Sequence, residues 1–79
     1  MSPTLFYFKH YRFFFFSREE TRKHVHVSSS DGEAKFWLEP SIELAKNYNL
    51  DQKELREVEF FVRNKKDEII EAWEKHFRN

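Results

Sequence analysis

The residues of this chain best suited to chemistry are the two histidines of the segment His24-Val25-His26. Strand side chains alternate in direction, so a strand here places both imidazoles on one face, with Cβ atoms roughly 7 Å apart. Such a pair can chelate a metal ion if a third ligand converges, and Glu20 in the preceding charged loop is the nearest candidate. The alternative is a structural role, with both rings partly exposed at a hairpin.

Acid–base chemistry is the other role open to this pair. A histidine can act as a general acid or base in phosphodiester cleavage, with Arg12 or Arg22 holding the phosphate. A His-x-His pair is a low-specificity signal, and no catalytic motif elsewhere supports it. We therefore take His24, His26 and Arg12 as catalytic candidates, but we expect a binding protein rather than an enzyme, and no cofactor.

The segment Arg12-Phe13-Phe14-Phe15-Phe16-Ser17 points to a sheet with two apolar faces. Four consecutive Phe cannot all face one side of a strand, so two must point away from the main core. We assign Phe13 and Phe15 to this second face. The other residues predicted to form a binding surface there or beside it are Trp37, His24, His26, Arg22, Lys23 and Lys35.

Three interpretations of this second face remain open, and we expect the first of them, an interaction protein that associates with itself or with a protein partner through this face. An apolar patch rimmed by polar groups is typical of a homo-oligomer interface or of an interface with a small protein partner. Aromatic rings on a sheet near Arg and Lys are also typical of surfaces that stack single-stranded nucleic acid. Alternatively, the chain itself covers the face and makes a second small core.

The elements that position these residues follow from period and turn signals. We expect strands at 4–8, 12–17, 24–28 and 34–38, with a fifth short strand near 42–44, so that the sheet spans 4–46. The segment Asn47-Tyr48-Asn49 is predicted to be a loop. Gly32 ends a turn-rich stretch and is expected to provide a positive φ.

A C-terminal helix is predicted from Asp51 to about 76 or 77. Asp51 and Glu54 have the spacing of a capping box. An apolar stripe at three- and four-residue steps follows, formed by Leu55, Val58, Val62, Ile69, Trp73 and His76 or Phe77. The predicted fold is α+β, with one long helix on one face of an antiparallel sheet of four or five strands. A helix of this length must kink near Asn64 or overhang the sheet.

Composition limits the class of protein. The chain has 79 residues, ten of them Phe, and its fourteen basic residues balance fourteen acidic ones. We predict a single domain over 1–79. Because the chain has no Cys, disulfides cannot stabilise so small a domain, and we expect its stability to come from aromatic packing or from oligomerisation. Zero net charge argues against a nonspecific DNA binder. With no signal peptide and no apolar run of ~20 residues, we expect a cytoplasmic protein outside the membrane.

The chain resembles the bacterial family described as domain of unknown function 4160. The resemblance rests on the Phe-rich strand, on His24-Val25-His26-Val27, on the segment from Ala34 to Pro40, and on Ile69-Ile70-Glu71-Ala72-Trp73. The family has a third His where this chain has Glu20, and a Pro-Pro pair where it has Arg22-Lys23. The resemblance implies a small α+β protein, often encoded beside a second small protein in toxin–antitoxin-like pairs, with no established activity.

Overall fold

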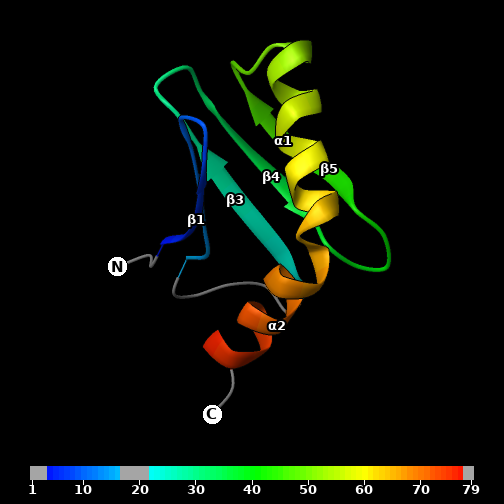
Figure 1. Ribbon diagram of the computed structural model, residues 1–79. Coiled ribbons are helices and arrows are strands. Elements are labelled where there is room, and N and C mark those ends of the chain that lie inside the picture. The colour runs from blue at the N-terminus through cyan, green and yellow to red at the C-terminus, as the bar shows by residue number, and fades with distance from the viewer. Residues whose placement is uncertain (1–3, 17–21, 78–79) are drawn as a thin grey trace.

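In the computed structural model, the described residues (4–16 and 22–77) form a five-stranded antiparallel sheet and two helices. The strands are β1 (Thr4–Phe8), β2 (Tyr11–Phe14), β3 (His24–Ser28), β4 (Glu33–Trp37) and β5 (Glu43–Tyr48). Each strand pairs with the next along the chain, so β1 and β5 are the two edges. Figure 1 shows α1 crossing one face of the sheet. The predicted α+β class is therefore confirmed.

The fifth strand is longer than the sequence indicated. We predicted a loop at 47–49, but β5 continues to Tyr48, and only Asn49 leaves the strand, with a φ of 68°. The extension arises because Asn47 pairs with Ala34 and Tyr48 pairs with Glu33 of β4. Ladder hydrogen bonds with a neighbouring strand thus outweigh the local turn preference of Asn.

The C-terminal segment forms two helices, α1 (Gln52–Asn64) and α2 (Lys66–His76), so the prediction of one long helix was wrong. Lys65 separates them with φ −108° and ψ 17°, outside helical geometry. The side-chain amide of Asn64 donates to the carbonyl oxygen of Phe60 at 2.8 Å, and a side chain that bonds this carbonyl competes with the helical ladder. Figure 1 shows the chain changing direction between the two helices.

The start of α1 is fixed by a capping box, as predicted. The Asp51 carboxylate accepts from the backbone N–H of Glu54 at 2.8 Å, and the Glu54 carboxylate accepts from the N–H of Asp51 at 2.9 Å. These bonds satisfy backbone donors that have no partner inside the helix. The helix therefore begins at a defined residue, and the Glu54 side chain has a defined position.

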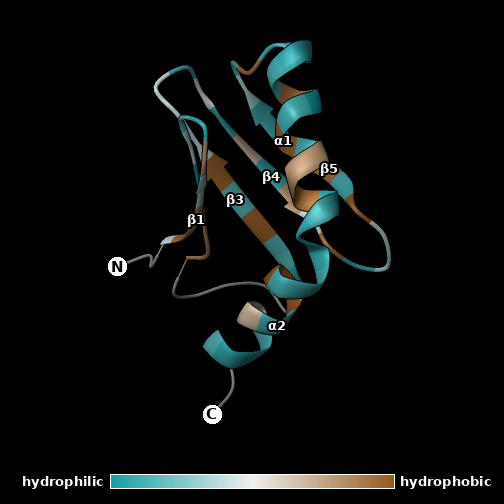
Figure 2. Cartoon of the chain, viewed as in Figure 1, coloured by the Kyte–Doolittle hydropathy of each residue, from teal (hydrophilic) through white to brown (hydrophobic). Residues whose placement is uncertain are grey.

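The core lies between the helices and the sheet face they cover. Val58 and Val62 of α1 and Ile69 and Trp73 of α2 are buried, which confirms the predicted apolar stripe. Figure 2 shows strongly hydrophobic residues on β3, while the visible turns of the helices are mostly hydrophilic. None of the helices in the described residues is long and apolar enough to cross a membrane.

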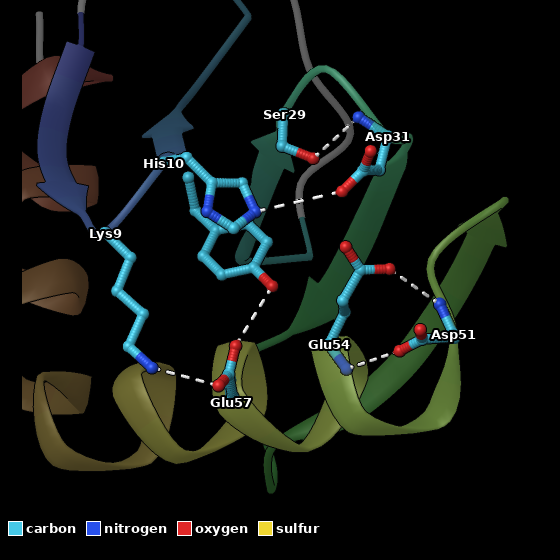
Figure 3. A network of polar contacts seen from close by, with 8 residues as sticks. Lys9, His10, Ser29, Asp31, Asp51, Glu54 and Glu57 are labelled. Carbon is cyan, nitrogen blue, oxygen red and sulfur yellow. Dashed lines mark hydrogen bonds and ion pairs between the residues drawn. The ribbon is translucent and has the colours of Figure 1, made fainter.

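Glu57 joins the β1–β2 turn to α1. Its carboxylate accepts from Lys9 Nζ at 2.9 Å and from the Tyr11 hydroxyl at 3.2 Å (Figure 3). The hydrogen bond from Lys9 lowers the pKa of Glu57. Burial, followed by the bond to Glu57, raises the pKa of Tyr11 to about 12. The folded chain therefore favours the neutral phenol of Tyr11.

This shift predicts a loss of stability in alkali. The pKa of Tyr11 is higher in the folded chain than in the unfolded chain. Its neutral phenol therefore stabilises the fold fully below pH ~10, and this contribution is lost as the pH rises to about 12. We expect denaturant unfolding to show this loss in the wild-type chain. A Tyr11→Phe variant, which has no phenol here to ionise, should show a smaller decline, and an equal decline would contradict the assignment.

We expected Gly32 to provide a positive φ, but no glycine in the described residues has a positive φ, so this prediction was wrong. Gly32 is needed instead because another part of the backbone approaches it closely. A methyl group built on Gly32 would collide with the carbonyl oxygen of Tyr48. Its own carbonyl oxygen accepts from the N–H of Ser29 at 2.9 Å, closing the β3–β4 turn. Gly32 therefore allows the turn to lie against the end of β5.

A Gly32→Ala substitution should destabilise the fold by about 1–3 kcal/mol, the usual cost of forcing an extra methyl group into a packed site. The backbone of Tyr48 cannot move aside without disturbing β5. Ser30→Ala, at an exposed position of the same turn, is the matched control and should change little. Denaturant unfolding of both variants measures the difference, and equal stabilities would contradict the collision.

Candidate functional site: the open face of the sheet

The face of the sheet away from the helices, here called the open face, carries aromatic rings from β2 and the residues that follow it. Phe14 stacks on His26 with centroids 5.6 Å apart, and Phe16 contacts the same ring at 4.4 Å. By contrast, Phe13 and Phe15 are fully buried on the helix side. Our assignment of Phe13 and Phe15 to the open face was therefore wrong by one residue.

The helices account for the observed alternation. Phe13 contacts Phe61 of α1 at 4.7 Å, and Phe15 contacts Trp73 of α2 at 5.2 Å. Tyr11 points the same way, because its hydroxyl donates to Glu57. Four Phe in a row do not define which alternate pair faces inward, so the sequence alone left this choice undetermined.

His24 and His26 lie together, as predicted, with ring centroids 5.2 Å apart, but their environments differ. His26 is partly exposed, whereas His24 is fully buried and contacts Trp73 at 4.9 Å and Trp37 at 5.5 Å. His24 Nδ1 donates to the Arg22 carbonyl oxygen at 2.7 Å, because a carbonyl can only accept. His24 therefore supports the end of the sheet, and His26 is the imidazole at the surface.

Basic side chains lie over the rings of the open face. The guanidinium carbon of Arg12 is 4.4 Å from the Phe14 ring centroid, and that of Arg22 is 4.3 Å from Trp37. The Lys35 ammonium is 4.5 Å from the same Trp37 ring. These distances are within the range of cation–π attraction. The structure thus brings the predicted binding residues Arg22, Lys35 and Trp37 into one group.

Lys23, another predicted binding residue, has a different environment. Its ammonium lies 3.3 Å from a carboxylate oxygen of Glu39 and 3.7 Å from one of Glu74 in α2. It therefore connects the sheet to α2 through two acidic side chains. Glu20, the third residue of the predicted metal site, lies outside the described residues.

A shallow pocket of about 180 Å³ opens on this face, and its lining residues are Phe16, His26, Glu33, Ala34, Lys35, Lys46 and Tyr48. Sequence reasoning missed Phe14, Phe16, Lys46 and Tyr48. Lys46 and Tyr48 are two residues apart, so a strand reading of this segment would have placed them on one face. The pocket combines two ammonium groups and one carboxylate with an imidazole and two aromatic rings, and this excess of positive charge suits an anionic ligand with a planar group.

The fold and this surface define a small α+β sheet protein with an aromatic, basic open face. The family model described as Domain of unknown function (DUF4160) matches residues 11–74, which is most of the chain. The chain therefore belongs to this family, and the resemblance noted from its sequence is confirmed. No curated protein and no solved structure matches the chain.

The assignment of faces predicts unequal effects of truncating the phenylalanines. Phe13→Ala and Phe15→Ala should each destabilise the fold by about 3–5 kcal/mol, because each removes a buried ring. Phe16→Ala should cost much less, because Phe16 is 44% exposed. Denaturant unfolding of the three variants measures this order, and a larger loss for Phe16→Ala than for Phe13→Ala would contradict the assignment.

Proposed function

We propose that the open face binds single-stranded RNA and that the protein acts in the cytoplasm as a binding module. The observation that carries the proposal is the seating of basic groups over aromatic rings, with Arg12 on Phe14 and with Arg22 and Lys35 on Trp37. Proteins bind single strands by stacking bases on aromatic rings or guanidinium planes while cations contact the phosphates. On the open face the rings of Phe16 and Tyr48 are exposed. Phe14 is buried beneath Arg12, so the guanidinium plane of Arg12, and not the ring of Phe14, is the surface on which a base could stack.

The pocket beside these rings suits one nucleotide. Tyr48 is 64% exposed and offers a ring face for stacking, and Lys35 and Lys46 line the same pocket. Because cations and a stacking ring are adjacent, a base and its phosphate can be bound together. His26 lines the pocket too, and it is the histidine positioned to exchange a proton with a bound ligand.

A protein partner is the main rival, either a second copy of the chain or a small protein of a toxin–antitoxin-like pair. Self-association through the open face would bring the cations of two copies, among them Lys35 and Lys46, into one interface, where like charges disfavour pairing. An acidic protein would not meet this repulsion. The surface chemistry thus favours an anionic partner over a second copy, and the stacking groups favour RNA over an acidic protein.

Binding of a short fluorescein-labelled oligouridylate, followed by fluorescence anisotropy at several salt concentrations, tests the proposal. Lys35→Ala with Lys46→Ala should weaken binding and reduce the slope of log K against log salt by about 0.7 per lost phosphate contact. Tyr48→Ala should cost about 1–3 kcal/mol of binding free energy.

The matched control is Lys53→Ala with Arg56→Ala, which removes the same charge from α1, the helix on the opposite face. This double variant should bind RNA as the wild type does. Equal losses in both double variants would show general charge attraction and contradict a specific surface. Light scattering that detects a dimer abolished by Tyr48→Ala, without RNA binding, would favour self-association instead. RNA cleavage lost in His26→Ala would identify a nuclease.

A further inference from the structure

A second group of side chains meets at the end of the sheet where α1 begins. His10 lies in the β1–β2 turn, Asp31 in the β3–β4 turn and Glu54 in the first turn of α1 (Figure 3). Within residues 4–16 and 22–77, this is the one group of three His, Asp or Glu side chains whose ligand atoms all lie within 4.8 Å of one another. None of the three was a sequence candidate.

Separate contacts hold these side chains in place. The ring of His10 lies 4.3 Å from the ring of Tyr11, measured between centroids. One carboxylate oxygen of Glu54 accepts from the backbone N–H of Asp51, and Figure 3 shows the other oxygen on the side of Asp31. Contacts that orient ligands in this way raise the affinity of a metal site, because less freedom is lost on binding.

The contact between the imidazole and a carboxylate of this group is long. His10 Nε2 lies 3.9 Å from Asp31 Oδ2, which is longer than a hydrogen bond. The ligand atoms of His10, Asp31 and Glu54 nevertheless lie close enough together for one ion to contact all three side chains.

We propose that His10, Asp31 and Glu54 form a binding site for a divalent transition-metal ion, with Zn²⁺ as the best fit. Zinc takes imidazole nitrogen and carboxylate oxygen as ligands and is usually four-coordinate. Three protein ligands leave one position for water. The ion would connect two turns of the sheet to the start of α1.

Titration of the untagged protein with zinc chloride, followed by calorimetry, tests the proposal, and Co²⁺ absorption reports the coordination geometry. The wild type should bind one ion, and its melting temperature should rise with zinc concentration and return on chelation. His10→Phe keeps a ring against Tyr11 but removes the nitrogen ligand. Glu54→Gln keeps a capping-box side chain but removes the charge. Each should weaken zinc binding by more than about tenfold.

The control is His76→Phe, which removes an exposed histidine at the end of α2 and should leave zinc binding unchanged. Melting of each variant without metal checks that it is folded. Zinc affinity that is the same in wild type and in the His10→Phe, Glu54→Gln double variant would overturn the proposal. So would a loss of binding in His26→Phe alone, because it would place the ion on the open face.

Discussion

The alternation of side chains along β2 is the constraint on which the rest of the structure depends. Tyr11, Phe13 and Phe15 face the helices, and this choice directs Phe14 and Phe16 to the open face. The core and the candidate binding surface are therefore made by the same short segment. A shift of one residue in this strand would exchange the two sets of rings.

The break at Lys65 is the second determinant, because it allows α2 to take a different direction from α1 at the end of the sheet. A straight continuation of α1 would extend beyond the strands. After the break, α2 brings Trp73 against Phe15 and against His24. One tryptophan thus closes the core and also covers the buried histidine that supports the open face. The geometry of the helix and that of the candidate site are linked at this residue.

Much of the fold could be predicted because its signals are local. The capping box at Asp51 and the apolar stripe through Val58 and Trp73 depend on residues within a few positions of one another. The errors occurred where distant contacts decide. The direction of Phe13 depends on Phe61, and the strand at Tyr48 depends on its pairing with Glu33.

The candidate sites show the same division. The adjacency of His24 and His26 follows from their spacing, but their different exposure depends on α2, which lies nearly fifty positions later in the chain. Likewise, no spacing rule connects His10 with Glu54, because two turns and a helix start meet only in the folded chain. Side chains that come from separate turns leave no periodic pattern in a sequence.

The order of the strands also has a consequence for how the chain folds. Among the described residues every strand pairs with its neighbour in sequence, so the sheet is built from consecutive antiparallel pairs. Topologies dominated by local contacts have low contact order and fold rapidly. The contacts of Glu57 with Lys9 and Tyr11 join residues more than forty positions apart. These long-range contacts therefore form only when α1 packs onto the sheet.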